Sequence, residues 1–302
     1  MATSRLTDEE VTSFVMGAND YVKLSVPYNT ILPVKRIKDG YKHTWYVNTE
    51  VDGAQGSKDG RQGHDVRTAR TSASANITSY VHTFQIPRVE VTMAQDTGVP
   101  LWSENINAAM RKMNDQILHL QIRGSSATYD TVSITGMYGG GTDVNAALDD
   151  KYWATASYPI LHHLTNGFAD LNTAGYTGPF TWLMSSALKP GLMNKYGAGD
   201  PTQMSMLADW GVNETIFLPT GTVTRMNVYP MGAATGDDGL WFLYPKNENY
   251  AYLAEVMPIT TTIDPELDTN LQCYHGRMEW RGTVAIVQAT SISHEDSVDL
   301  VV

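Results

Sequence analysis

Residues 102–124 read WSENINAAMRKMNDQILHLQIRG, and this stretch predicts the clearest helix of the chain. Its large apolar side chains recur at steps of three and four positions, the spacing of one buried helix face. Pro100 stands near a first-turn position, where its missing N–H costs nothing, and Gly124 is placed to end the helix. At about 1.5 Å per residue the helix is on the order of 35 Å long, the length of a domain. The side chains expected to face the core are Trp102, Ile106, Met110, Met113, Ile117 and Leu120.

A polar, glycine-rich segment lies upstream of this helix, between two strand-like runs at 41–51 and 77–92. Residues 52–65 contain four glycines and no large apolar side chain, so they cannot bury enough surface to order themselves. The sequence therefore predicts an extended hairpin that projects from the body. Because a lone hairpin is marginal in water, we expect it to rest on a second copy of the chain. The expected contact residues are Asp52, Gly56, Lys58, Arg61, His64 and Arg67.

Residues 1–45 have weak helical spacing, and they are interpreted as an arm. Pro27 and Pro33 bracket an apolar stretch, residues 28–32, that is expected to be extended. A basic cluster follows, which is expected to be solvated; contact with an acidic partner surface is the alternative. This cluster consists of Lys35, Arg36, Lys38 and Lys42.

The rest of the chain predicts an α+β fold, with a mixed sheet interrupted by helices. A glycine-rich turn is expected at 136–141 and a helix at 158–171. A strand at 180–184 comes next, followed by helical segments at 186–196 and 202–210. Further strands are expected at 214–218, 225–229, 240–245, 250–258, 271–277 and 282–289.

Composition limits the classes of function. With 302 residues the chain is long enough for one large domain or two modest ones. Charged residues make up 18% of the chain, below the roughly 25% of soluble domains, which suggests that partners cover much of its surface. The net charge of −11 argues against general nucleic-acid binding.

Charge is unevenly distributed along the chain. Residues 1–123 carry 14 Lys/Arg and 13 Asp/Glu, whereas residues 124–302 carry 7 and 19. One half can therefore complement the other half of a neighbouring copy, although chance explains the asymmetry equally well.

Targeting signals are not expected. No apolar run approaches the roughly 18 residues of a membrane helix, and the first ten residues are acidic and polar, unlike a signal or transit peptide. The single cysteine, Cys273, excludes an intrachain disulfide. Synthesis in the cytoplasm fits these features best.

Three groups of polar residues could suggest an ion or acid–base site, and each has a simpler interpretation. His162 and His163 are adjacent on a helix and point about 100° apart, so they cannot chelate one ion. Residues 236–239, Gly-Asp-Asp-Gly, form a good turn and do not match a calcium loop. The carboxylates of Asp264, Glu266 and Asp268 stand in a proline-flanked segment that is expected to be a solvated loop.

Two further patterns could suggest catalysis or phosphate binding. Cys273 and His275 are two positions apart and share a strand face, but no third orienting residue is evident. Residues 139–141 are glycines without the Lys-Ser/Thr of a phosphate loop. The sequence thus predicts no catalytic residue, no cofactor and no metal site.

The order of the parts resembles the Hong Kong 97-type capsid fold, which major capsid proteins of tailed viruses share with encapsulin shells. Residues 102–124 look like the spine helix of that fold, and residues 135–137, Thr-Gly-Met, look like the segment that follows it. Residues 180–218 are similar to its axial-domain pattern, and residues 250–290 to its closing strands.

The resemblance implies five segments. They are an N-terminal arm at 1–45, an extended β-hairpin loop with flanking strands at 46–92, a peripheral domain with the long spine helix at 93–157, an axial domain at 158–257, and a return to the peripheral domain with C-terminal strands at 258–302.

The resemblance also implies a function. The expected role is a structural, non-enzymatic major capsid protein of a bacteriophage, whose hexamers and pentamers enclose double-stranded DNA in a virion. Its main partner is itself, with portal, separate scaffolding or cement proteins and packaged DNA as further partners, and no membrane. A fused scaffolding segment is not expected, because the predicted arm is short. Covalent cross-linking is not carried over, because nothing identifies an asparagine partner for Lys58.

Two alternatives remain open. An encapsulin-type compartment that encloses protein cargo shares the fold, and particle diameter and nucleic-acid content would separate it from a capsid. The short, mainly extended N-terminal part favours the capsid, since encapsulins generally use a helical segment there. An α+β enzyme such as a hydrolase would instead be a monomer or small oligomer with a concave site.

Overall fold

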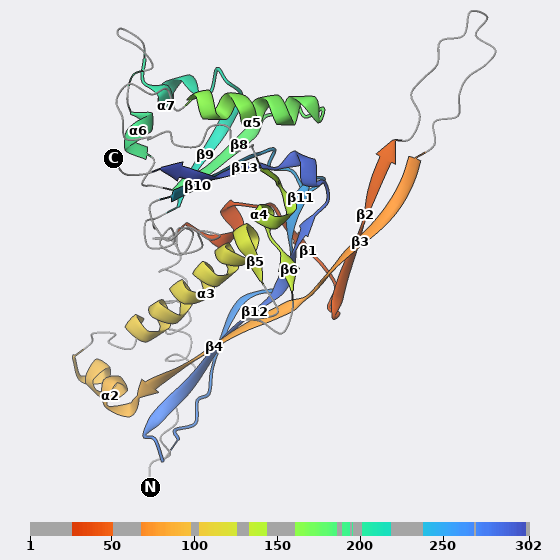
Figure 1. Ribbon diagram of the computed structural model, residues 1–302. Coiled ribbons are helices and arrows are strands. Elements are labelled where there is room, and N and C mark those ends of the chain that lie inside the picture. The colour runs from red at the N-terminus through yellow and green to blue at the C-terminus, as the bar shows by residue number, and fades with distance from the viewer. Residues whose placement is uncertain are drawn as a thin grey trace, which may run out of the picture.

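The computed structural model describes residues 26–50, 68–97, 103–125, 133–143, 161–185, 189–193, 195, 201–218, 238–268 and 270–299. These residues form a four-stranded sheet, a five-stranded sheet, a projecting two-stranded ribbon and a short two-stranded pairing (Figure 1). Within these ranges no helix combines the length and apolarity needed to cross a lipid bilayer. The predicted α+β class is confirmed, with two mixed sheets where the sequence suggested one.

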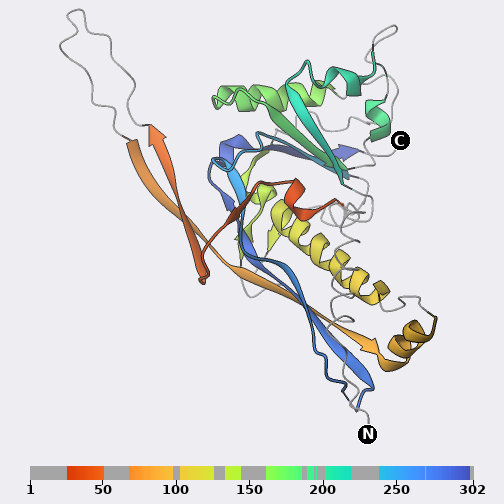
Figure 2. The same cartoon turned by 180° about the vertical axis from the view of Figure 1, so that it is seen from behind.

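The four-stranded sheet carries the long helix α3 (Ser103–Arg123) on one face (Figures 1 and 2). The strand order is β1 (Val34–Arg36), β11 (Ala251–Ile263), β12 (Cys273–Ile286) and β4 (Thr78–Pro87). β1 runs parallel to β11, and the other neighbours are antiparallel. Apolar side chains of helix and sheet merge into the larger hydrophobic core.

The apolar stripe of α3 faces this core. Burying one side chain of this size stabilises the fold by about 1.5–3 kcal/mol. The buried positions include Ile106, Met110, Met113, Ile117 and Leu120, whereas Trp102 lies outside the described residues.

The helix ends as its sequence requires. Gly124 has φ +78°, a conformation that suits glycine, and it pairs with Thr135 where β5 (Gly124–Ser125) meets β6 (Ile134–Thr135). A Cβ on Gly124 would lie 2.1 Å from the Ile134 carbonyl oxygen. The single helical turn α4 (Met137–Gly140) then occupies the glycine-rich segment that was predicted to be a turn.

Two amide side chains of α3 hold the segment that precedes β1. Asn114 accepts a hydrogen bond from Tyr28 N at 2.9 Å and donates one to Val26 O at 3.0 Å. One heptad later, Gln121 accepts from Leu32 N at 3.3 Å and donates to Tyr28 O at 2.7 Å. Buried amides must be paired, and here they pair with backbone groups far away in sequence.

The extended stretch predicted at 28–32 is therefore wrong. Tyr28–Thr30 is a 3-10 turn, η2, and Ile31 and Leu32 are fully buried in the core of their own chain. The hydroxyl of Tyr244 donates to Ile31 O at 2.7 Å and adds a further tie. The prolines on either side made this stretch look extended, but burial of two large side chains decides its conformation.

The five-stranded sheet lies beyond one end of α3. Its order is β7 (Thr142–Asp143), β13 (Ser293–Asp299), β10 (Asp238–Tyr244), β8 (Phe180–Ser185) and β9 (Val212–Leu218). The helix α5 (Leu161–Thr173) covers it (Figure 1). Leu164 and Leu171 of this helix pack with Trp182 and Trp241 in a second core. Gly167 lets α5 approach, because a Cβ there would lie 3.1 Å from the Trp241 ring.

The projecting ribbon consists of β2 (Lys42–Glu50) and β3 (Thr68–Asn76), paired from Lys42↔Asn76 to Glu50↔Thr68. The predicted pairing of 41–51 with 77–92 is wrong, because β4 pairs with β12. The strand predicted through residue 92 is also wrong beyond Pro87, since α2 (Arg88–Thr97) follows. β12 begins at Cys273, opposite Pro87, so it has no residue beyond this pair to continue the ladder.

Several smaller predictions also differ from the structure. The strands expected at 271–277 and 282–289 are one strand, β12, followed by the 3-10 turn η5 (Ala289–Ser291). Gly282 lies inside β12, close to the neighbouring strand β11: a Cβ there would lie 2.6 Å from the Ala254 carbonyl oxygen. Within the described residues, the helices expected at 186–196 and 202–210 shrink to α6 (Lys189–Leu192) and α7 (Gln203–Met206). The strand expected at 225–229 lies outside the described residues.

Candidate assembly surfaces

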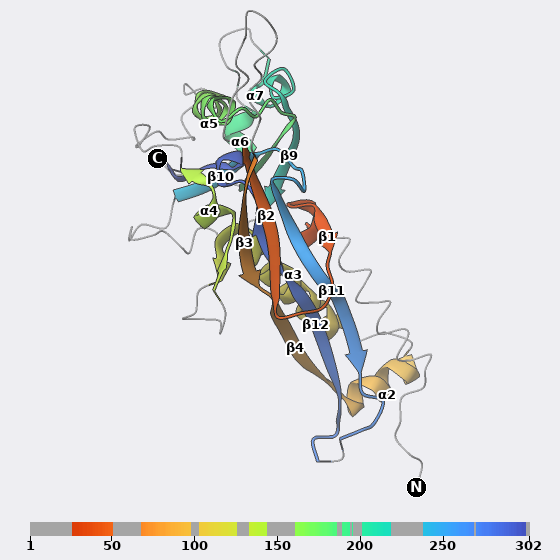
Figure 3. The same cartoon turned by 90° about the vertical axis from the view of Figure 1, so that its right-hand side faces the viewer.

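The β2–β3 ribbon leaves the body of the molecule at an angle and extends well beyond it (Figures 1 and 2). In Figure 3 the ribbon stands in front of the long strands of the four-stranded sheet. Strand β3 carries mainly small threonine, serine and alanine side chains, and Tyr46 of β2 is exposed with Arg70 stacked 4.0 Å over its ring. A two-stranded ribbon this long has little to stabilise it in water, so its faces are candidate contact surfaces.

The six predicted loop contacts lie outside the described residues. They are Asp52, Gly56, Lys58, Arg61, His64 and Arg67. The ladder of β2 and β3 ends at Glu50 and Thr68, so the segment between them starts and finishes at the free end of the ribbon. Their role in contacts between copies stays a prediction.

The base of the ribbon is fixed to its own chain. The Trp45 indole donates to Ile286 O at 3.2 Å, and Trp45 packs on a small apolar cluster around Tyr252 and Ala285. His43 Nε2 lies 2.8 Å from the Tyr252 hydroxyl. Burial, and next the charge of Lys35, lower the pKa of His43, so this ring favours the neutral form. These contacts set the direction in which the ribbon leaves the body.

The opposite end of the four-stranded sheet exposes apolar side chains. Val89 and Met93, one turn apart on α2, are more than half exposed, as is Leu271 in the β11–β12 turn. Arg88 N donates to Gln272 O at 2.9 Å and joins the start of the helix to this turn. Exposed apolar groups that gather at the tip of a molecule are typical of contact sites.

The basic cluster near the N-terminus is partly neutralised within the chain. Arg36 pairs with the buried carboxylate of Glu255 at 3.3 Å, and Lys35 lies 4.0 Å from Glu248. Both cations keep about half or more of their side chains exposed, at 61% and 49%, as expected for a solvated cluster.

Cys273, His275 and Asp268 come together, so the expectation that no third residue would accompany the thiol is wrong. Cys273 Sγ lies 3.8 Å from His275 Nε2, and the same nitrogen lies 3.3 Å from Asp268 Oδ2. A catalytic histidine uses one nitrogen for the nucleophile and the other for the carboxylate, and here both neighbours share one nitrogen. Cys273 is also buried. The arrangement does not have the geometry of a thiol nucleophile.

The carboxylates of Asp264 and Asp268 accept hydrogen bonds from backbone N–H groups in turns. Asp268 accepts hydrogen bonds from Asn270 N and Leu271 N, and these bonds, followed by the one from His275, lower its pKa. Asp264 accepts from Glu266 N at 3.0 Å and is exposed, as expected for a solvated loop.

The other expected sites are only partly described. No group of three or more His, Cys, Asp or Glu residues in the described part of the chain could hold a metal ion. Asp238 and Gly239 belong to strand β10, so the turn predicted at 236–239 is wrong for these two residues, and the rest of it lies outside the described residues. The side chains of His162 and His163 lie outside the described part as well.

No protein-family model matches the sequence, and no curated protein matches it at a significant level. Solved structures, in contrast, match over almost the whole chain. A virus-like particle protein from Pyrococcus furiosus matches with TM-score 0.64 at 12% identity, over 94% of this chain and 98% of its own.

Two phage structures match equally well. The capsid of Myoviridae phage XM1 matches with TM-score 0.61 at 15% identity, over 99% of this chain and 96% of its own. A Mycobacterium phage Bobi structure matches with TM-score 0.62 at 13% identity, over 90% of each chain. The predicted Hong Kong 97-type capsid fold is confirmed by these similarities.

Proposed function

We propose that this chain is a major capsid protein, whose copies assemble as hexamers and pentamers into an icosahedral shell around a double-stranded DNA genome. The observation that carries the proposal is the similarity to solved shell structures along the full length of both chains. A match of one shared domain would leave room for another activity elsewhere, whereas these matches span 94% and 99% of this chain.

The shape of the molecule supports self-association. The ribbon reaches away from the body on one side, and apolar residues are exposed at the far tip of the four-stranded sheet. Different surfaces on one chain make head-to-tail contacts, and such contacts close into rings when the rotation between copies allows it. An arm that overlaps a neighbour adds contact area to each step of the ring.

The proposal assigns the remaining roles accordingly. The chain acts as a structural component of a virion, without catalysis and without a cofactor, after synthesis in the host cytoplasm. The net charge of −11 fits packaged DNA that is enclosed without sequence-specific binding. Portal, separate scaffolding or cement proteins are the further partners that such a shell would use.

Particle formation tests the proposal. The purified chain, expressed alone and with its neighbouring genes, is examined by size-exclusion chromatography and negative-stain electron microscopy. Closed particles in the megadalton range are expected. A stable monomer or small oligomer under every assembly condition would contradict the proposal and favour the hydrolase-like alternative.

A protein-cargo compartment is the second candidate, because the virus-like particle from Pyrococcus furiosus matches this chain as well as the phage structures do. The contents of particles purified from the natural source separate the two. Nuclease-protected DNA of genome length is expected for the capsid, and an enclosed protein without nucleic acid for the compartment.

A further inference from the structure

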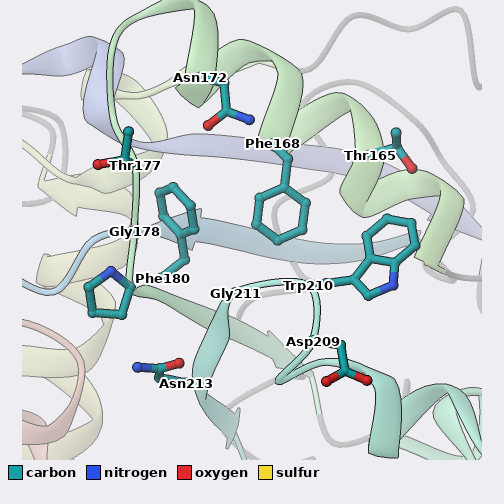
Figure 4. Close-up of a pocket in the computed structure, with 11 residues that line it drawn as sticks. Thr165, Phe168, Asn172, Thr177, Gly178, Phe180, Asp209, Trp210, Gly211 and Asn213 are labelled. Carbon is teal, nitrogen blue, oxygen red and sulfur yellow. The ribbon is translucent and has the colours of Figure 1, made fainter.

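A pocket of about 490 Å³ opens between α5 and the starts of β8 and β9, away from the surfaces described above (Figure 4). Aromatic rings form its wall: the Phe168 ring lies 5.4 Å from that of Phe180 and 6.3 Å from that of Trp210, centroid to centroid. Phe180 is buried, while Phe168 and Trp210 are half-buried and keep part of their surface open. The volume falls within the range of small-molecule sites.

Polar side chains stand around these rings, Thr165 and Thr177 among them (Figure 4). The three with an amide or carboxylate group are Asn172 from the end of α5, Asp209 from the turn before β9, and Asn213 from β9 itself. All three are exposed, and within the described part of the chain none of their side chains has a hydrogen-bond or ion-pair partner. They come from three separate elements, and no described residue pairs with their hydrogen-bonding groups.

The chemistry of the lining selects the kind of ligand. Among the described residues of the lining there is no lysine, arginine or histidine, so these residues offer phosphate and carboxylate groups no cation to pair with. Asp209 only accepts hydrogen bonds, and therefore needs a ligand that donates, whereas the two amides both donate and accept. The aromatic faces carry partial negative charge and attract C–H groups.

We propose that this pocket binds a neutral sugar ring. The C–H face of a pyranose stacks on the exposed aromatic surface of Phe168 and Trp210, and its hydroxyls donate to Asp209 and exchange hydrogen bonds with Asn172 and Asn213. A proline-rich peptide also stacks on aromatic residues, but its prolines have no N–H to donate to Asp209. The lining therefore fits a sugar better than such a peptide.

Assembled particles provide the test, by saturation-transfer NMR titration with methyl α-glucoside, methyl α-galactoside and N-acetylglucosamine. At least one sugar is expected to give a saturable signal. Asp209→Ala and Asn213→Ala should each weaken binding about tenfold, the effect of losing one good hydrogen bond. Asp170→Ala is the matched control, because Asp170 is exposed on the same helix as Phe168 but lies outside the pocket.

Four results would overturn the inference. The first two are the absence of a saturable sugar signal at millimolar concentrations, and sugar binding by the Asp209→Ala variant that equals that of the unaltered chain. The other two are saturable binding of an oligoproline peptide or of arginine methyl ester instead of a sugar, and sugar binding to the unassembled subunit but not to particles. The last would mean that a neighbouring copy covers the pocket. Particles of each variant are counted by electron microscopy, so a failure to bind sugar remains distinct from a failure to form a shell.

Discussion

At the scale of single residues, one buried carboxylate joins three parts of the chain. Glu255 of β11 is 1% exposed and its Oε1 accepts hydrogen bonds from the Tyr28 hydroxyl at 2.7 Å and the Trp280 indole at 2.9 Å. Arg36 pairs with its other oxygen. Glu255 thereby ties the segment before β1 to the middle of the four-stranded sheet.

Replacement of Glu255 by alanine should lower the free energy of unfolding of the unassembled subunit by about 2–5 kcal/mol, because two buried donors lose their acceptor. Glu255→Gln keeps an oxygen at the same place and loses only the pairing with the exposed Arg36, so it should cost about 1 kcal/mol or less. Urea unfolding measures both. Equal losses in the two variants would show that the ion pair, and not the two hydrogen bonds, provides the stability.

The tyrosine hydroxyls of this region predict a dependence on pH. Burial, and next the hydrogen bond to Glu255, raise the pKa of Tyr28, and burial likewise raises the pKa of Tyr244 and Tyr252. The unfolded chain releases these protons near pH ~10, where the folded chain still holds them. Their contribution to stability is therefore complete below pH ~10 and is lost as the pH rises above it.

The free energy of unfolding should thus fall as the pH rises above about 10, with a shallower slope in Tyr28→Phe than in the unaltered chain. Tyr41→Phe serves as the control, since Tyr41 is 90% exposed. Chemical denaturation at several pH values gives the slopes. A Tyr28→Phe slope identical to that of the parent would argue against the role of burial at this position.

At the scale of elements, the α3 helix supplies the clearest prediction. Met113→Asp or Ile117→Asp should abolish soluble subunit, because an unpaired charge in the larger core costs several kcal/mol. Lys112→Asp, at an exposed neighbouring position, should leave the subunit soluble. Soluble yield and circular dichroism decide between these outcomes. A folded Met113→Asp subunit would mean that the stripe is not essential to the core.

The sequence predicts some of these elements far better than others, for physical reasons. The α3 helix is found because its large side chains repeat with the period of a helix. The sequence did not reveal β3, because Thr68–Asn76 contains no large apolar side chain. The extended conformation of this strand comes from its pairing with β2. Val89 and Val91 alternate like a strand, yet they lie in α2, because β12 begins opposite Pro87 and has no residue to pair with them.

The contact surfaces were less accessible to sequence reasoning than the fold. The ribbon was anticipated from the glycine-rich sequence between its strands, but its true second strand was not. Nothing in the sequence indicated that Trp45 and His43 fix its base. Asn114 and Gln121 stand seven positions apart on α3, a spacing that marks one helix face, and this could have suggested buried polar partners. The partners are backbone groups of residues 26–32, which local patterns do not reveal.

At the scale of the whole molecule, we expect the ribbon to serve assembly and the body to provide the stability of the fold. Removal of residues 53–63 leaves the ladder from Lys42↔Asn76 to Glu50↔Thr68 intact, with residues 51–52 and 64–67 to join the two strands. Among the described residues, neither of the two larger hydrophobic cores includes one from the ribbon. We therefore expect a subunit with unchanged stability that no longer forms shells, or forms shells that dissociate more readily.

Sedimentation and electron microscopy of this deletion measure assembly, and urea unfolding of the unassembled subunit measures the fold. In a second variant, residues 53–63 are replaced by a glycine–serine segment of equal length. This variant separates the effect of the length of the segment, its reach, from the effect of its side chains. If reach alone matters, this variant assembles; if Lys58 or Arg61 contact a neighbour, it fails as the deletion does. If the deletion variant forms particles of normal yield and stability, residues 53–63 make no contact that assembly requires, and the predicted role of this segment is wrong.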